Sequence, residues 1–283
     1  MIIFSHRGLD PDKKDYYLES SRESFLDQVK RGYGLEFDLQ PTQDGEFIIF
    51  HDSSLERISG GDDTRRFNTM KFDEILKLEI KKCHLIDLVS ILKIAEKKGV
   101  FSAIHVKYLV QTNLFMDKFL EILNMFDCSK IIIFDLIPEF ANYLKKKNSN
   151  LILAASVSHP YDIERYGKQV GGTLLSVDEI ISYKSLYDWA WLDEWDRSDR
   201  NGGYKSLYNT EVFDKLRKNN FKIAVVSPEL HGSSPGLLGG EFHQDADDRN
   251  VLLDRLNEII SIKPDAICTD YPDLLSSMKL LYV

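Results

Sequence analysis

The sequence predicts an α/β fold, a (β/α)8 TIM barrel built as a single domain over residues 1–283. Short apolar runs rich in β-branched residues alternate with longer amphipathic segments along most of the chain. Eight such runs can be counted, which is the number a closed parallel barrel needs. The chain has 283 residues, 43% of them hydrophobic, enough for one large core. A doubly wound open sheet is the alternative arrangement of the same elements.

The expected strands and helices alternate through most of the chain. Strands are expected at residues 1–5, 34–40, 101–106, 130–136, 151–156, 189–195, 221–227 and 265–270. Amphipathic helices are expected at residues 85–99, 114–126, 138–147, 210–220 and 251–262. Several of these helices begin near Pro or Thr and end in Lys, Asn or Gly, which are common start and stop signals.

Two stretches exceed a minimal barrel repeat. Residues 43–63 contain the turn Asp44-Gly45 followed by the run Phe47–Phe50, which predicts a small hairpin or extra strand inserted after the second strand. Residues 228–248 are rich in Gly, Ser and Pro and follow the seventh strand, which predicts a long loop at the rim.

Composition excludes several classes of partner. Lys and Arg total 36 against 45 for Asp and Glu, a net charge of −9, so no general basic surface exists for nucleic acid or an anionic membrane. The cysteines Cys83, Cys128 and Cys268 are far apart and odd in number, which predicts reduced thiols rather than disulfides or a zinc site. No apolar run is long enough to span a bilayer, and a cytoplasmic protein is expected.

A pair of carboxylates lies on the second expected strand. Side chains alternate along a strand, so Glu36 and Asp38 point to the same side. Two like charges facing a barrel interior are costly unless a cation joins them, and their hard oxygen atoms suit Mg²⁺ or Ca²⁺. The alternative is an exposed strand end with two solvated carboxylates.

Histidines close two of the apolar runs. His6 follows the first strand and His51 follows the run Phe47–Phe50. Cleavage of a phosphodiester needs one group to accept a proton and another to protonate the leaving oxygen, and imidazole can do either. The alternative for each is a structural, hydrogen-bonded histidine.

Two cations stand beside these histidines and carboxylates in the expected fold. Arg7 follows His6, and Lys107 alternates with His105 at the end of the third strand. Both would face the barrel mouth and contact the oxygens of a phosphate. An internal ion pair with Glu36 or Asp38 is the alternative for Lys107.

The order of these motifs resembles the opening of the glycerophosphodiester phosphodiesterase family. The matching elements are HRG at residues 6–8, LESSRESF at 18–25 and GLEFDLQPTQDGEFIIFHDSSLERISG at 34–60. Later agreement is limited to the strand leading to Lys107 and the segment ICTDYPDLL at 267–275. The resemblance implies a (β/α)8 barrel that cleaves a small glycerophosphodiester to glycerol phosphate and an alcohol, with one divalent cation, Mg²⁺ or Ca²⁺, as cofactor.

The resemblance also implies roles for individual residues. By this resemblance the site comprises the acid/base pair His6 and His51, the phosphate contacts Arg7 and Lys107, the metal ligands Glu36 and Asp38, and the supporting residue Glu19. Neither a nucleic-acid partner nor stable membrane insertion is expected.

One departure from the family pattern concerns the metal. Family members carry a glutamate two residues before the lysine as a third ligand, and this chain has His105 there. Imidazole binds softer cations better than Ca²⁺ or Mg²⁺, which brings Mn²⁺ into consideration. Alternatively, another carboxylate replaces the missing one, or metal binding is weakened. Asp135, Asp193 and Glu229 each follow an expected strand, and Asp193 and Glu229 are preferred because both fall on the rim.

The other departure is the loop after the seventh strand. Together with Trp189, Trp191 and Trp195, this loop would shape the alcohol side of the substrate, although tryptophans most often serve core packing. Two rival functions keep the same barrel. One is a lyase-type phospholipid phosphodiesterase, and the other is a barrel that binds a phosphorylated glycan or lipid head group without cleaving it.

Overall fold

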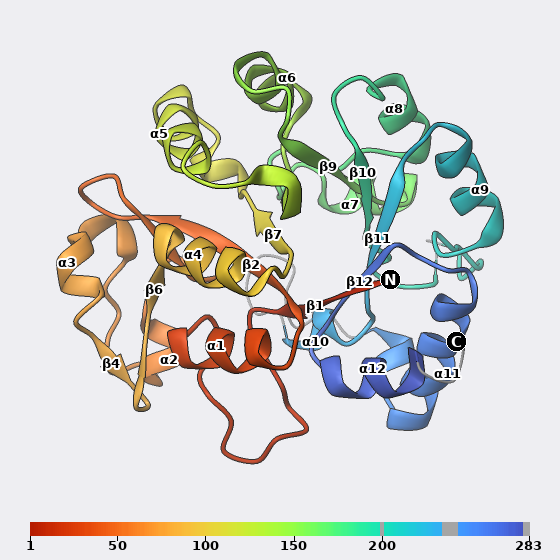
Figure 1. The fold of residues 1–283 in the computed structure, drawn as a ribbon. Helices are drawn as coiled ribbons and strands as arrows, with labels where there is room; N and C mark the ends of the chain where they lie inside the picture. Colours follow the sequence, from red (N-terminus) through yellow and green to blue (C-terminus); the bar gives the residue numbers. More distant parts are fainter. Residues whose placement is uncertain (199–200, 234–242, 280–283) are drawn as a thin grey trace.

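The computed structural model describes residues 1–198, 201–233 and 243–279, and its central feature is a closed barrel of eight parallel strands (Figure 1). These strands are β1 (Ile2–His6), β2 (Gly34–Pro41), β7 (Ser102–His105), β8 (Ile131–Phe134), β9 (Ile152–Val157), β10 (Trp189–Leu192), β11 (Lys222–Val226) and β12 (Ala266–Thr269). Because β1 pairs in parallel with both β2 and β12, the sheet closes on itself. The predicted barrel is confirmed, and the open sheet was the wrong alternative.

Helices surround this barrel on its outer face (Figure 1). The longer ones are α1 (Arg22–Lys30), α4 (Leu88–Lys98), α5 (Asn113–Leu123), α6 (Pro138–Lys147), α7 (Pro160–Tyr166), α8 (Val177–Ser182), α9 (Thr210–Lys218), α11 (Arg249–Ser261) and α12 (Pro272–Lys279). Side-chain caps fix several of their first turns, as Asp87 does for α4 and Asn209 for α9. All five predicted helices are present.

The insertion after β2 is larger than the sequence suggested. Strand β3 (Phe47–Ile49) pairs antiparallel with β2, as predicted, and β6 (Ile86–Asp87) pairs antiparallel with β3. Between them lie α2 (Glu56–Ser59), α3 (Phe72–Ile75) and the short pair β4 (Glu79–Ile80) and β5 (Cys83–His84). A separate apolar cluster that includes Phe50 and Phe67 supports this region, so the segment leading to His51 is rigidly packed.

Alternation along the strands separates two apolar layers. Outward side chains pack against the helices, whereas inward ones, such as Phe4, Phe134 and Trp191, fill the barrel. The Trp191 ring stacks on Phe134 with centroids 4.2 Å apart. Trp189 and Trp191 are each only 3% exposed, so both serve the core. Gly34 makes room for Phe4, because a Cβ there would lie 2.8 Å from the Phe4 ring.

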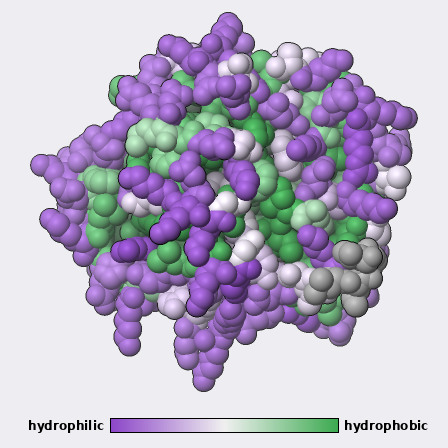
Figure 2. Space-filling view, in the orientation of Figure 1, coloured by the Kyte–Doolittle hydropathy of each residue, from purple (hydrophilic) through white to green (hydrophobic). Residues whose placement is uncertain are grey.

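The remaining expectations about the chain concern its surface and thiols. The three cysteines are free and buried. Hydrophilic side chains cover most of the face shown in Figure 2, and in the described ranges no helix has the length and apolar character needed to cross a membrane. After β11 the chain forms α10 (Leu230–Ser233), and residues 234–242 of the predicted rim loop lie outside the described residues.

Candidate active site

The predicted polar residues gather at the carboxyl ends of β1, β2 and β7. In the register of the barrel, His6 lies beside Glu36, and Asp38 lies beside His105. All four side chains are on the inward side of their strands, following Phe4 and Ala103 of the barrel interior. Strand pairing therefore places two histidines and two carboxylates together, as the sequence predicted.

Each of the two predicted acid/base histidines is held by a carboxylate. His6 Nδ1 lies 2.7 Å from Asp270 Oδ1, and His51 Nδ1 lies 2.6 Å from Asp52 Oδ1. Among the described residues, no hydrogen bond involves the Nε2 atom of either ring. A carboxylate on Nδ1 fixes the orientation of an imidazole and leaves Nε2 to exchange a proton. The two rings are thus prepared for acid/base chemistry.

The surroundings of His51 keep it neutral. Burial lowers the pKa of His51 to about 3, and the positive charges of Lys107 and Arg7 act in the same direction, against the attraction of Asp38. A neutral imidazole can accept a proton during a reaction. The inserted strand β3, which ends just before Phe50, delivers this group to the barrel mouth.

Arg7 sits in a tight turn directly after β1. Its φ is 51° and that of Gly8 is 70°, and a Cβ on Gly8 would lie 2.6 Å from Ser24 Oγ. The turn therefore requires glycine at the second position. It directs the buried Arg7 side chain to Asp38, with Nε 3.4 Å from Oδ2, and to Glu19, with Nη1 3.6 Å from Oε2.

Glu19 is connected to the site through a second arginine. Arg57 of α2 donates through Nη1 to Glu19 and through Nε to Asp52 Oδ2, the latter at 2.7 Å. Since Asp52 also holds His51, Arg57 connects Glu19 to the histidine predicted to act in acid/base catalysis. Arg57 lies in the motif that followed His51 in the sequence, which was the available signal for its role.

Lys107 both faces the site and makes an internal ion pair. Its Nζ lies 3.2 Å from Asp38 Oδ1 and also donates to the His51 carbonyl. Burial lowers the pKa of Lys107, and the nearby Arg7 adds to this, although Asp38 opposes both. The ion pair between Lys107 and Asp38, which was the alternative to a phosphate contact, is thus present. Lys107 still lies where a phosphate contact was expected.

The two carboxylates on β2 have opposite electrostatic surroundings. Burial alone would raise the pKa of Asp38, but Lys107, His51, His105 and Arg7 together hold it well below its usual value. Burial raises the pKa of Glu36, and the neighbouring Asp38 raises it further. Glu36 is 4% exposed, and within the described chain its carboxylate has neither a hydrogen bond nor an ion pair.

This arrangement fits a divalent cation. A buried carboxylate without a counter-charge is costly, and a cation beside it would remove that cost. Donor atoms of Glu36, Asp38 and His105 all lie within 4.8 Å of one another, close enough to share one ion. These three are the residues that can hold the metal implied by the family resemblance.

His105 has a carboxylate on each ring nitrogen. Its Nδ1 lies 2.8 Å from Asp38 Oδ1, and its Nε2 lies 3.1 Å from Asp135 Oδ2. Burial lowers the pKa of His105, but these two hydrogen bonds outweigh it and raise the pKa to about 9. The ring also stacks on Phe134, with centroids 4.8 Å apart. Asp135 is therefore connected to Asp38 through the hydrogen bonds of His105.

The other two suggested substitutes lie elsewhere on the rim. Asp193 follows β10, across the mouth from β2, and its Oδ1 is 3.1 Å from His231 Nε2. Glu229 Oε1 accepts hydrogen bonds from the hydroxyls of Ser227 and Thr269 and from the Asp270 amide. In the part of the chain that is described, neither of them belongs to the group of Glu36, Asp38 and His105 that could hold a metal ion.

Trp195 stands on the same side of the mouth as Asp193. It is half-buried, donates to Ser158 Oγ at 3.3 Å, and packs against Tyr166 and His231 with ring centroids 4.8 and 5.2 Å away. Its part in shaping the alcohol side of the substrate stays a prediction.

Sequence reasoning did not single out Asp270 as a site residue. It follows β12, the last barrel strand, which pairs with β1 and so brings Asp270 next to His6. The only signal was its position in the segment ICTDYPDLL, directly after an apolar run.

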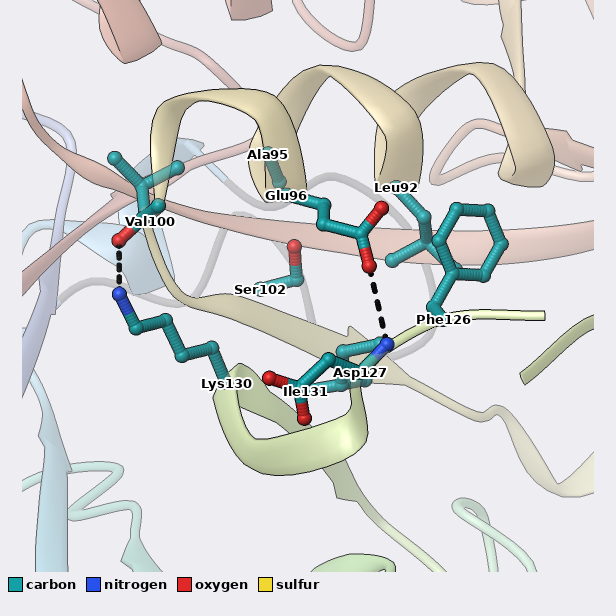
Figure 3. A pocket seen from close by; sticks show the side chains of 10 residues that line it. Leu92, Ala95, Glu96, Val100, Ser102, Phe126, Asp127, Lys130 and Ile131 are labelled. Atoms are coloured by element: carbon teal, nitrogen blue, oxygen red, sulfur yellow. Dashed lines mark hydrogen bonds between the residues drawn. The ribbon is translucent and has the colours of Figure 1, made fainter. Parts of the chain in front are cut away.

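A separate cavity of about 120 Å³ lies between α4 and the start of β8 (Figure 3). Two of its polar groups are paired locally, because Lys130 Nζ donates to the Gly99 carbonyl at 2.6 Å and Glu96 accepts from the Asp127 amide at 3.1 Å. The hydroxyl of Ser102, which also lines the cavity, has no hydrogen-bond partner among the described residues. The cavity lies at the amino-terminal ends of the strands, away from the histidines.

Comparison with known proteins agrees with this site. The model of the glycerophosphoryl diester phosphodiesterase family matches residues 6–274. No curated protein is a match. Many solved structures are similar to this one, and three of those that match nearly its whole length are described below.

The first is a glycerophosphoryl diester phosphodiesterase from Parabacteroides distasonis, at 17% identity and a TM-score of 0.69, covering 100% of this chain and 87% of that one. The second, from Thermotoga maritima, has 18% identity and a TM-score of 0.63, with 98% and 97% covered. The third is an Oleispira antarctica phosphodiesterase in complex with the product sn-glycerol-3-phosphate, at 14% identity and a TM-score of 0.63, with 98% and 96% covered.

The structures share the barrel, and the family model spans both the histidines of the site and the segment that carries Asp270. The resemblance seen in the motifs is therefore confirmed, and the chain belongs to the glycerophosphoryl diester phosphodiesterase family.

Proposed function

We propose that this enzyme hydrolyses a glycerophosphodiester to glycerol phosphate and an alcohol by metal-assisted, two-histidine catalysis. The observation that carries the proposal is a pair of histidines, each held at Nδ1 by a carboxylate, beside the buried Glu36, whose carboxylate has no direct hydrogen bond or ion pair among the described residues. A phosphodiesterase of the same fold was solved with sn-glycerol-3-phosphate, which supports a product of this class.

The protein's own groups have distinct parts in this reaction. His51 is neutral and accepts a proton from the attacking water as its oxygen bonds to phosphorus, and His6 protonates the alkoxide of the alcohol that leaves when the other P–O bond breaks. Arg7 and Lys107 face the non-bridging oxygens and offset their charge. A divalent cation held by Glu36, Asp38 and His105 would polarise the phosphate when bound.

The test is release of glycerol 3-phosphate from a panel of glycerophosphodiesters by chelator-treated protein, before and after adding Mg²⁺, Ca²⁺ or Mn²⁺. Metal-restored release is expected. His6→Ala and His51→Ala should each lower turnover by about 10²- to 10⁴-fold while circular dichroism stays unchanged.

His84 provides a matched control. It is also paired with a carboxylate, Glu23 at 3.1 Å, but lies on β5 and is 45% exposed at its side chain. His84→Ala should keep wild-type turnover. Full activity in both site variants would refute the assignment. A cyclic phosphate as the final product would favour the lyase, and binding without turnover would favour the non-catalytic barrel.

A further inference from the structure

The ring of His105 is held from three sides. Asp38 Oδ1 lies 2.8 Å from Nδ1, Asp135 Oδ2 lies 3.1 Å from Nε2, and the Phe134 ring stacks on one face at an interplanar angle of 14°. Phe134 in turn stacks on Trp191, so the support continues into the barrel core. A side chain fixed in this way presents its nitrogen atoms in a defined direction.

The spacing around Nδ1 suits a shared metal ion. Two neighbouring ligands of a six-coordinate cation, with bonds of about 2.1 Å, lie about 3 Å apart. The separation of 2.8 Å between His105 Nδ1 and Asp38 Oδ1, a hydrogen bond in this structure, is close to this value, so a cation that replaces the shared proton can contact both atoms. Glu36, buried and without a hydrogen bond or ion pair among the described residues, completes the group from the same strand as Asp38.

Asp135 occupies the position of an orienting partner. A histidine that binds a metal through one nitrogen commonly donates its other N–H to a carboxylate, which fixes the tautomer and makes the ligand more basic. Asp135 meets Nε2 in this way, and its backbone adopts a φ of 67°, in the left-handed region, at the end of β8. Aspartate tolerates this conformation better than most residues.

We propose that His105 is a nitrogen ligand oriented by Asp135, and that it makes this site select a first-row transition cation over Mg²⁺ and Ca²⁺. The inference rests on the cation site of the proposed function. Imidazole favours such cations, whereas an all-oxygen site suits Mg²⁺ and Ca²⁺. Mn²⁺ is the probe of choice because it is paramagnetic and reports the nuclei of its ligands.

The experiment is calorimetric titration of chelator-stripped protein with MnCl₂ and MgCl₂, together with pulsed electron paramagnetic resonance of the Mn²⁺ complex. Coupling to one ¹⁴N nucleus and at least tenfold tighter binding of Mn²⁺ than of Mg²⁺ are expected. His105→Glu should remove the coupling and reduce the Mn²⁺ preference by about tenfold. Asp135→Asn should retain the coupling but weaken Mn²⁺ binding by about 10- to 100-fold.

His231→Gln is the control. His231 is another histidine at the barrel mouth and faces the carboxylate of Asp193, but it is not one of the three residues that could hold the metal. It should change neither the coupling nor the affinity. Mn²⁺ bound without nitrogen coupling, or coupling that persists in His105→Glu, would overturn this inference and leave the proposed hydrolysis standing. Absence of any cation binding would overturn the cation site itself, and glycerol 3-phosphate release measured separately would still test the hydrolysis.

Discussion

Two clusters of buried charge lie at the carboxyl end of the barrel, and they differ in how completely they are paired. On the side of β10, Glu194 binds Arg255 at 2.6 Å, and Lys205 binds both Asp162 at 2.6 Å and Asp196 at 2.9 Å. On the side of β2, three cationic groups form ion pairs with Asp38, whereas Glu36 forms none within the described residues and feels His6, His105 and Arg7 only from a distance. The first cluster is closed by its own counter-charges, and the second leaves one negative charge for a ligand.

The difference shows which charges belong to structure and which to function. A buried ion pair that is complete holds two segments together and offers nothing to solvent. Glu194 illustrates this, because its second oxygen also accepts from the amides of Leu207 and Tyr208. Glu36 is buried to a similar degree but is supported only if a proton or a cation joins it.

The largest effect is expected from Glu36→Gln. Removal of a metal-binding carboxylate should lower turnover by about 10³-fold, equivalent to about 4 kcal/mol of barrier. Stability without metal should be kept or increased, because a neutral amide replaces a buried carboxylate with a raised pKa. Steady-state kinetics and urea unfolding in chelator check both parts. A large loss of stability would show that Glu36 is structural.

Glu194→Gln should have the opposite profile. It removes the carboxylate at 2.6 Å from the buried Arg255, which keeps the partly exposed Glu258 at 2.7 Å and Asp245 at 3.2 Å. The free energy of unfolding should fall by about 3 kcal/mol. Turnover per folded molecule should stay near wild type. A selective loss of activity with normal stability would mean that both clusters belong to the site.

The sequence was informative wherever a property repeats locally. Apolar runs predicted all eight barrel strands, and alternation predicted that Glu36 and Asp38 share a side, which the register beside His6 and His105 confirms. These features depend only on neighbouring residues along one strand, so they can be predicted from the local sequence pattern. The histidines were identified because each ends such a run.

Contacts between distant segments could not be read in the same way. His6 and Asp270 are 264 residues apart in sequence, and only closure of the barrel makes them neighbours. The pairing of His105 with Asp135 also needs the register of β7 against β8. Asp193 and Glu229 were preferred from their rim positions alone, but the partners that surround them come from other loops. The sequence pattern alone does not show which residues from distant segments come into contact.

The burial of His51, which lies beside the Asp38 cluster, leads to a prediction about the pH dependence of stability. His51 has a pKa of about 3 in the folded protein, against about 6.5 in an unfolded chain. The unfolded state therefore binds the proton first as pH falls, and stability is lost from about pH 6.5 downward toward pH 3. Between pH 7 and pH 4 the free energy of unfolding of the wild-type protein should fall by on the order of 3 kcal/mol because of His51, and His51→Gln should lack this loss. Urea unfolding of both proteins at the two pH values checks this, and parallel curves would contradict it.

The smallest effect is expected where a charge pair is exposed and belongs to neither cluster. Lys215 binds Asp178 at 2.6 Å, but the Asp178 side chain is 82% exposed, so water screens the attraction and solvates either partner alone. Asp178→Asn should change the free energy of unfolding by no more than about 0.5 kcal/mol and leave turnover unchanged. Urea unfolding at low and high salt measures this. A loss as large as that expected for Glu194→Gln would mean that the presence of an ion pair, rather than its burial, determines stability in this barrel, and the contrast between the two clusters would lose its physical basis.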